Sequence, residues 1–179
     1  MRGLRLLIPH LLADPFSRML RAFLLAAVLV MTACTPDAPD PPPSGEPTFT
    51  KDGTLTFLRP DSSAIVTIDI EIANTDAKRN RGLMRRRSMG YDKGMLFIFD
   101  TVEAGSMWMK NTPLPLDMIF VDAEGQVVDI VERTMPFSLD PITPDAPRKY
   151  TVEVRAGFVN RYTITDSTRI TWTRAADAT

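Results

Sequence analysis

The chain has 179 residues, a length that predicts one domain, and its 21 lysines and arginines nearly balance 22 aspartates and glutamates. The first 33 residues hold four of the basic residues and one of the acids, so the remainder carries 17 against 21 and a net charge of −4. An acidic balance gives no general attraction to phosphate backbones, and we therefore expect no nucleic-acid partner.

The chain has one cysteine, Cys34, and one histidine, His10, and both belong to an apolar N-terminal stretch or its end. If that stretch is removed, the rest of the chain has no histidine and no cysteine beyond its first residue. Catalysis by Ser-His-Asp or Cys-His groups then lacks its base. Zinc sites of the His/Cys type lack their ligands. We expect no metal and no cofactor, and a domain held together by its core alone.

Residues 1–33 are interpreted as a signal peptide, with Met19 as an alternative start. The apolar run 22–33 is preceded by arginines and is too short to span a bilayer comfortably. Two small residues precede Cys34. The sequence that ends at this cysteine resembles a bacterial lipobox, although Met31 stands where leucine is usual. The resemblance implies that Cys34 is lipidated and becomes the new N-terminus. An uncleaved anchor and a plain secretory signal are the alternatives.

Lipid chains on Cys34 would hold the exported protein at a membrane. The next residue is Thr35, not the aspartate that resembles an inner-membrane retention signal of some Gram-negative bacteria. We therefore expect a periplasmic, membrane-anchored protein, with the outer membrane preferred over the inner.

Residues 34–47 comprise the lipidated cysteine and a linker, in which six of the thirteen residues after Cys34 are proline. Such a segment favours extended polyproline geometry and cannot bury a core. A single β-rich domain is expected over 48–174, followed by a disordered tail at 175–179.

In the first half of the domain, the hydrophobic pattern predicts two strands and then a helix. Residues 54–58 alternate weakly, as in a short edge strand, whereas 64–73 place four branched apolar side chains on one face. The Asn-Thr-Asp sequence at 74–76 is a helix start, and the helix is predicted to continue to about Arg86.

The second half of the domain is predicted to be mainly strands. The expected strands are 95–99, 105–110, 117–121, 126–131, 149–154 and 169–173. Residues 117–131 are typical of a hairpin, the proline-rich stretch 136–148 of a long surface loop, and 156–162 of one or two helical turns. The fold class expected is α+β and mainly antiparallel β, a small, partly closed β-barrel-like domain with one or two short helices.

Five blocks of sequence occur in an order and spacing that resemble a known family. They are Arg81-Gly82-Leu83-Met84, Gly94-Met95-Leu96-Phe97, Trp108-Met109-Lys110-Asn111-Thr112, Pro115-Leu116-Asp117 and Ala156-Gly157. On these blocks the chain resembles the domain of unknown function 192 family over roughly residues 66–170. The resemblance implies a compact, mainly β domain of prokaryotes that is often exported, and it implies no reaction. Many members have Tyr-Pro-Ser in the long loop, where this chain has Ile142-Thr143-Pro144-Asp145.

The polar residues around the Trp-Met-Lys-Asn-Thr block form the candidate ligand site. Trp108 and Lys110 share one face of the predicted strand with Ser106, and Asn111 and Asp117 bracket a loop stiffened by two prolines. Together they offer an apolar platform, an amide and opposite charges for a polar ligand. The structural alternative is that Asn111 and Asp117 cap backbone amides and that Trp108 belongs to the core.

Arg81 is the fifth candidate and belongs to a basic segment. That segment contains Lys78, Arg79, Arg81, Arg85, Arg86 and Arg87. An anion or membrane-surface patch is one interpretation, and a solvated helix face is the preferred one. Because Arg81 lies inside a family-like block, we expect it to pair with a carboxylate such as Asp117 or Glu153.

Three functions fit these residues. The first is a non-enzymatic binding or accessory domain, tethered in the envelope, for a polar ligand such as a glycan or peptide. The alternative is a carboxylate-dependent hydrolase of a cell-envelope glycan, with Asp117 paired to Glu153 or Asp129. The second alternative is copper(I) binding through Met107 and Met109, against which methionine in a packed core is the ordinary interpretation.

Overall fold

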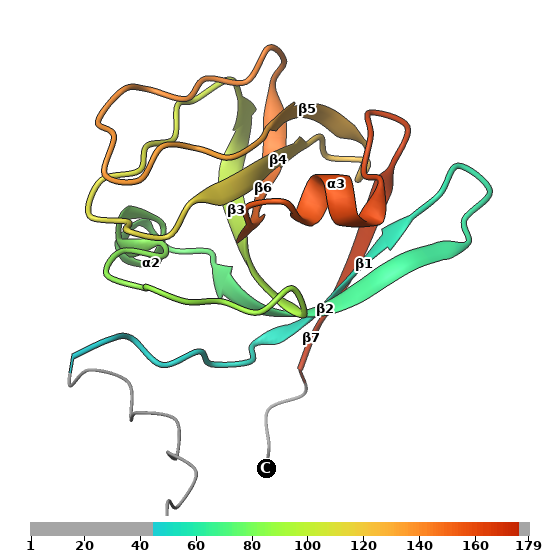
Figure 1. Ribbon diagram of the computed structural model, residues 1–179. Coiled ribbons are helices and arrows are strands. Elements are labelled where there is room, and N and C mark those ends of the chain that lie inside the picture. Colours follow the sequence, from blue (N-terminus) through green and yellow to red (C-terminus); the bar gives the residue numbers. More distant parts are fainter. Residues whose placement is uncertain (1–44, 176–179) are drawn as a thin grey trace, which may run out of the picture. The chain divides into compact units, whose positions relative to one another are not determined.

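The computed structural model describes residues 45–175 (Figure 1). The predicted signal peptide, Cys34, most of the linker and nearly all of the tail lie outside the described residues. The elements are β1 (Gly53–Leu58), β2 (Ala64–Ala73), α2 (Asp76–Arg81), β3 (Lys93–Glu103), β4 (Leu116–Val121), β5 (Val127–Val131), β6 (Arg148–Arg155), α3 (Phe158–Tyr162) and β7 (Arg169–Arg174). None of the helices described is long and apolar enough to cross a bilayer.

The seven described strands form one sheet in the order β5-β4-β6-β3-β2-β1-β7. Every neighbouring pair is antiparallel except β2 and β3, which are parallel and are joined by the crossover that contains α2. The α+β, mainly antiparallel fold is therefore confirmed. So is the hairpin of β4 and β5, whose register pairs Met118 with Val131.

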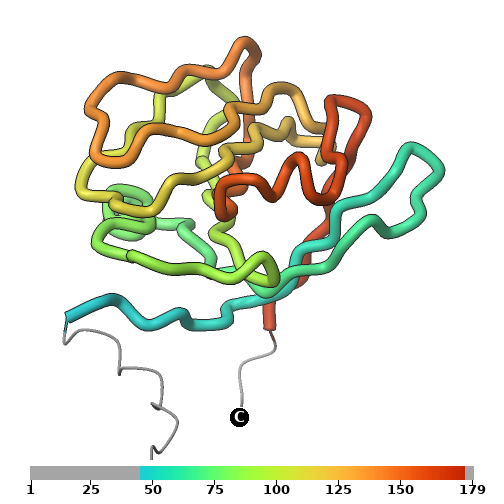
Figure 2. The backbone as a smooth tube through the Cα atoms, in the orientation of Figure 1, coloured from blue at the N-terminus to red at the C-terminus, as the bar shows by residue number. Residues whose placement is uncertain are grey.

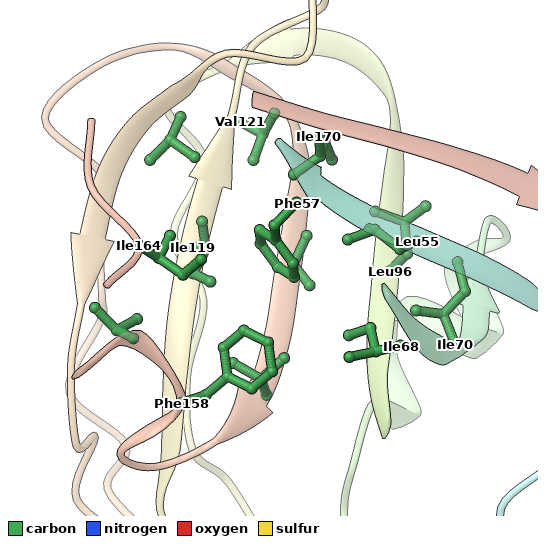
Figure 3. Packing of buried hydrophobic residues seen from close by; sticks show 14 of the residues in the cluster. Leu55, Phe57, Ile68, Ile70, Leu96, Ile119, Val121, Phe158, Ile164 and Ile170 are labelled. Carbon is green, nitrogen blue, oxygen red and sulfur yellow. The ribbon is translucent and has the colours of Figure 1, made fainter. Parts of the chain in front are cut away.

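The inner face of the curved sheet encloses the larger of two hydrophobic clusters (Figure 3). The alternation predicted for β2 is correct, because Ile68, Ile70 and Ile72 are all buried there. Phe158 of α3 packs against Phe57 with ring centroids 5.3 Å apart, so α3 closes one end of this cluster. Burial of this kind of side chain contributes about 1.5–3 kcal/mol each.

The two edge strands approach each other and make the domain barrel-like in part. Gln126 and Arg169 form an isolated bridge, and Ile170 donates a backbone hydrogen bond to Gly125 over 2.7 Å. No continuous ladder joins β5 to β7 in the described sheet, so the barrel is not closed.

The outer face of β3, β4 and β6 carries the second cluster, which irregular segments cover. Its buried members are Ala73, Leu83, Met89, Met95, Phe97, Met109, Leu114, Leu116, Met118 and Phe120. Leu83, Met89, Met109 and Leu114 come from the segments between strands. Methionine suits this layer because its flexible side chain fills gaps between irregular backbone.

Two predicted strands differ from those observed. β1 is not an edge strand, because β7 pairs with it on the side opposite to β2. Residues 105–110 form no strand; β3 runs on past its predicted end at residue 99 to Glu103, and Met107 makes only a single bridge to Ile142. Both errors have one cause. Whether a segment with alternating apolar and polar residues becomes a strand, and where it lies in the sheet, depends on pairing with segments distant in sequence.

The helix α2 begins as predicted and ends five residues early. The Thr75 side chain caps it by accepting a hydrogen bond from the Lys78 amide, and it ends at Arg81. Gly82 then adopts φ 45° and ψ −138°, which no helix allows, and a Cβ there would lie 3.2 Å from the Phe97 ring. Glycine at this position lets the chain turn closely over β3.

The contacts of the domain begin at Glu46, two residues before the predicted start. Its carboxylate accepts hydrogen bonds from the Arg87 and Ser88 amides, at 2.7 and 3.2 Å. The Thr50 amide donates to Glu71 over 2.9 Å. Both buried clusters are complete within 55–170, so this domain has its own core.

Candidate functional site

A cleft of about 350 Å³ opens on the outer side of the sheet, between the end of α2 and the segment that follows β3. It is lined by Arg79, Asn80, Arg81, Gly82, Leu83, Met84, Phe97, Phe99, Ser106, Met107, Trp108, Lys110, Thr112, Leu139, Pro141 and Glu153. Three of the five predicted site residues, Arg81, Trp108 and Lys110, are in this set. The cleft combines an apolar lining with a few polar groups, as ligand sites do.

Trp108 and Lys110 line the cleft from an irregular segment, although they were predicted on a strand. The Trp108 side chain is 48% exposed, and the Lys110 ammonium lies 5.1 Å from the centre of its ring. Ser106 lines the same cleft and shares a 2.7 Å hydrogen bond with Thr143. A large, half-exposed indole beside a cation is a surface on which a ligand can stack.

Glu153 lies in the centre of the sheet, on β6, and lines the same cleft while only 4% exposed. Its cross-strand neighbours are Met95 and Met118. Within residues 45–175 its carboxyl makes no hydrogen bond and no ion pair. Burial raises the pKa of Glu153 to about 8, so the group is mostly uncharged near neutral pH. A largely buried carboxyl without a protein partner can form hydrogen bonds with the polar group of a ligand.

Arg81 lines the cleft as an exposed side chain. It makes no salt bridge among the described residues, so its expected pairing with Asp117 or Glu153 is wrong. The buried arginine of this basic segment is Arg86, which binds Glu71 at 2.7 Å. The interpretation of the basic segment as a solvated helix face is therefore also wrong, because Arg86 lies after the end of α2 and points into the protein.

Asn111 faces a different hollow. Its backbone φ is 55°, its carbonyl accepts from the Arg85 amide over 2.7 Å, and its side-chain amide lies 3.8 Å from the Met84 sulfur. It lines a neighbouring hollow of about 380 Å³ with Arg85, Arg87 and Phe137. The structure thus separates Asn111 from Trp108 and Lys110.

Asp117 is fully buried and binds only backbone. One carboxylate oxygen accepts from the Arg133 amide over 2.8 Å, and the other accepts from the Gly157 and Val159 amides at 2.9 and 3.0 Å. These bonds fasten the end of β5 and the start of α3 to β4. This geometry fits the structural interpretation, in which Asp117 caps backbone amides.

The acids that a glycan hydrolase would use do not meet. Asp117 pairs with Val154 and Met118 with Glu153 across β4 and β6. Cross-strand partners share a face of the sheet and successive residues alternate, so Asp117 and Glu153 point to opposite faces. Asp129 holds the Asp145 amide over 3.1 Å, away from the cleft. Among the described residues that line the cleft, Glu153 is the one carboxylate.

Metal ligands are not gathered in the part of the chain that is described. No group of three or more His, Cys, Asp or Glu residues there is placed to hold a metal ion. The two methionines of the copper hypothesis differ, since Met109 is fully buried with its sulfur 3.2 Å from the Thr134 hydroxyl, whereas Met107 lines the cleft.

Sequence reasoning named Glu153 only as a partner for other residues and not as a site residue. The signal was present, because Glu153 stands between Val152 and Val154, two apolar residues that face the core. What the sequence lacked was evidence that the outer face of this strand is also covered.

These features belong to a small β domain with a cleft on its outer face, and comparison with known proteins assigns its family. The chain belongs to the DUF192 family, described as an uncharacterized ACR, whose model matches residues 57–172. The resemblance in the sequence is thereby confirmed.

Two solved structures share the fold. One is described as a "putative transcription regulator" from Sinorhizobium meliloti 1021; it is 34% identical, with a TM-score of 0.65, over 72% of this chain and 98% of that chain. The other is a protein of unknown function from Novosphingobium aromaticivorans DSM 12444, 28% identical, with a TM-score of 0.63, over 66% of this chain and 84% of that one. A comparison with curated proteins finds no match.

Proposed function

We propose that this protein is a lipoprotein of the bacterial envelope, tethered through Cys34, whose domain binds a polar ligand without catalysis. The ligand class is a glycan or a peptide, and the binding site is the cleft that Glu153 and Trp108 line. The observation that carries the proposal is the Glu153 carboxyl, which is buried, lines an open cleft and has no partner within residues 45–175.

Glu153 supports binding of a ligand that brings its own hydrogen-bonding group. The carboxyl reaches the open cleft, so a ligand hydroxyl or amide there would exchange hydration for a direct hydrogen bond, a net gain of about 0.5–1.5 kcal/mol. As an uncharged acid, the group can donate one hydrogen bond and accept others. Sugar hydroxyls and peptide amides both match this pattern.

The mouth of the cleft supplies the other contacts. The half-exposed indole of Trp108 offers an apolar plane for a sugar ring or a peptide side chain. Lys110 and Arg81 place positive charge at the rim, which favours an anionic substituent such as a carboxylate. These three residues orient a ligand whose polar group points inward to Glu153.

Hydrolysis and copper binding have less support. A hydrolase of either stereochemistry needs two carboxyl groups about 5–10 Å apart across the bond, and the cleft described has Glu153 without a second acid. Copper(I) would require thioethers free to move together, whereas Met109 is packed in the core.

Calorimetric titration with chitotriose and trialanine, one glycan and one peptide probe, tests the cleft. Glu153→Leu removes the acid while keeping an apolar side chain of similar size, and we expect it to weaken binding at least tenfold. Glu124→Gln, at an exposed glutamate, is the matched control and should bind as the parent does. Failure of both probes to bind, or equal binding by Glu153→Leu, would contradict the proposal.

Fluorescence gives a second readout at the rim. In a Trp172→Phe background, Trp108 is the one remaining tryptophan of the chain. A ligand that stacks on the indole should shift its emission, and Lys110→Ala should reduce the shift. An emission spectrum that stays constant while calorimetry records binding would place the ligand elsewhere.

The proposed lipid anchor and the proposed location in the outer membrane are inferred from the signal peptide, the lipobox-like residues and Thr35. Mass spectrometry of the mature N-terminus in the producing cells is the test, and we expect a lipid-modified Cys34 in the outer-membrane fraction. An unmodified Cys34, or a leader still attached, would remove the anchor from the proposal without affecting the cleft.

Nucleic acid is not among the partners proposed. The description of the Sinorhizobium meliloti relative names transcription regulation, but the net charge of −4 after residue 33 opposes binding to phosphate backbones. A gel-shift assay at low salt should show no retardation of duplex DNA.

A further inference from the structure

Large apolar side chains are exposed on one stretch of the long loop between β5 and β6. Met135 is 73% exposed, Phe137 61% and Leu139 68%. Single exposed apolar residues are ordinary on protein surfaces, but three at alternate positions in five residues form a patch that marks a contact surface.

The loop is held in place by hydrogen bonds. Phe137 donates from its amide to the Thr112 carbonyl over 3.1 Å, and the Met109 amide donates to the Ser138 carbonyl over 3.1 Å. Phe137 has φ 62°, a left-handed conformation that is uncommon for a bulky residue. The surrounding bonds therefore maintain the outward position of its ring, which a loop free to relax could instead bury.

Positive charge and the N-terminal end of the domain lie beside this loop. Phe137 lines the 380 Å³ hollow together with Arg85, Arg87, Gly45 and Glu46. Arg85 and Arg87 are exposed, and neither makes a salt bridge within residues 45–175. The apolar patch is thus flanked by two cations where the chain enters from Cys34, eleven residues before Gly45.

We propose that this surface, the loop face of Met135, Phe137, Leu139, Arg85 and Arg87, docks the domain onto an anionic lipid bilayer. The apolar side chains would enter the headgroup region while the two guanidinium groups contact lipid phosphates. A chain of eleven residues spans at most about 40 Å. The inference rests on the tether of the proposed function, which keeps the loop face within that distance of the membrane and raises its effective concentration there.

Docking through the loop face would also orient the cleft. Leu139 belongs to both surfaces, since it lines the cleft beside Trp108. The ligand site would therefore open next to the headgroups and take ligands at the membrane surface.

Co-sedimentation with vesicles tests the docking on a chain without lipid, residues 34–179 carrying Cys34→Ser. We expect binding to vesicles that contain 30% phosphatidylglycerol in phosphatidylcholine, weaker binding at high salt, and little to pure phosphatidylcholine. Met135→Ser/Phe137→Ser/Leu139→Ser should lower the binding at least tenfold, and so should Arg85→Gln/Arg87→Gln.

The matched controls lie elsewhere on the domain. Val102→Ser removes another exposed apolar side chain, and Arg59→Gln removes a cation on the turn between β1 and β2. That turn and the cyan segment that begins at residue 45 lie on opposite sides of the view in Figure 2. Both controls should bind vesicles as the parent does, and near-ultraviolet circular dichroism should show that every variant is folded.

Other outcomes would overturn the inference. If the parent chain ignores anionic vesicles but sedimentation velocity shows a dimer that the triple variant loses, the loop face binds a second copy instead. Equal vesicle binding by the parent and the loop variants would remove the loop face from the contact. Glu153→Leu should bind vesicles normally, so failure of the ligand proposal remains separate from failure of this one.

Discussion

Glu153 shows how strongly one residue's chemistry depends on its surroundings. The side chain has the pKa of an ordinary glutamate, 4.5, when solvated, and burial raises that value to about 8 in the folded domain. The cause is desolvation of the charged form, with no neighbouring charge to offset it. Such a carboxyl is mostly protonated at neutral pH, and the uncharged form is better suited to hydrogen bonding with a ligand than to pairing with a cation.

Replacement of Glu153 by glutamine should flatten the dependence of stability on pH. Between pH 4.5 and 8 the unfolded chain has released this proton and the folded chain has not. The free energy of unfolding therefore falls as pH rises through this window, by up to about 5 kcal/mol, and levels off above pH 8. Glutamine has no proton to release, so Glu153→Gln should be more stable than the parent at pH 8 and similar at pH 4.5.

Urea denaturation at pH 4.5, 6.5 and 8 would measure this effect. The exposed Glu124→Gln serves as the control and should follow the parent at each pH. A parent midpoint that does not fall between pH 4.5 and 8, relative to that of Glu153→Gln, would show that the carboxyl is solvated or has found a partner.

At the scale of elements, Asp117 joins three parts of the chain. Its two carboxylate oxygens receive amides from the residues after β5 and from the first turn of α3, while its own backbone belongs to β4. The residue was a ligand candidate because it follows a proline-rich loop, but every hydrogen bond it makes in the described structure serves the backbone. Asp117 thus positions the segment after β5 and the start of α3, neither of which belongs to the sheet.

Asp117→Asn should destabilise the domain by about 2–4 kcal/mol, because an amide nitrogen would replace an acceptor that faces backbone donors. Thermal unfolding followed by circular dichroism measures the loss, and Asp166→Asn, at an exposed aspartate, is the control. If Asp117→Asn lost ligand binding while its melting temperature stayed at the parent's value, Asp117 would be a ligand residue after all.

At the scale of the whole molecule, the approach of the two sheet edges depends on the turn before β5. Gly125 has φ 85°, and a Cβ there would lie 2.7 Å from the Ile170 carbonyl oxygen of β7. Next to this turn, the Val127 amide at the start of β5 donates to the carbonyl of Thr168, just before β7, over 3.0 Å. A side chain at this glycine would push the two edges of the sheet apart.

Gly125→Ala should cost about 1–3 kcal/mol of stability through backbone strain alone and should open the edge contact. Hydrogen exchange of the Val127 and Ile170 amides reports the opening, and we expect both to lose protection. Gly105→Ala, whose neighbours are flexible side-chain atoms, should leave both amides protected. Unchanged exchange in Gly125→Ala would show that the edges meet independently of this turn.

Residues near one another in sequence determined much of the fold. The alternation in β2, the hairpin of β4 and β5, the start of α2 and the absence of histidine and cysteine chemistry from residues 35–179 could all be read directly. They depend on periodicity and composition, which local sequence contains. Trp108, Lys110 and Arg81, three of the five predicted site residues, line one cleft, and all three lie in the sequence blocks that resemble the family.

Only the tertiary structure decided the rest. The β1–β7 pairing, the cover over the outer face, the separation of Asn111 from the cleft and the unpaired burial of Glu153 all come from segments that meet across long stretches of chain. Burial and pKa depend on every group packed around a residue, whereas a sequence shows only the neighbours along the backbone. For the same reason, the exposed loop of Phe137 and its two flanking arginines became a surface only in three dimensions.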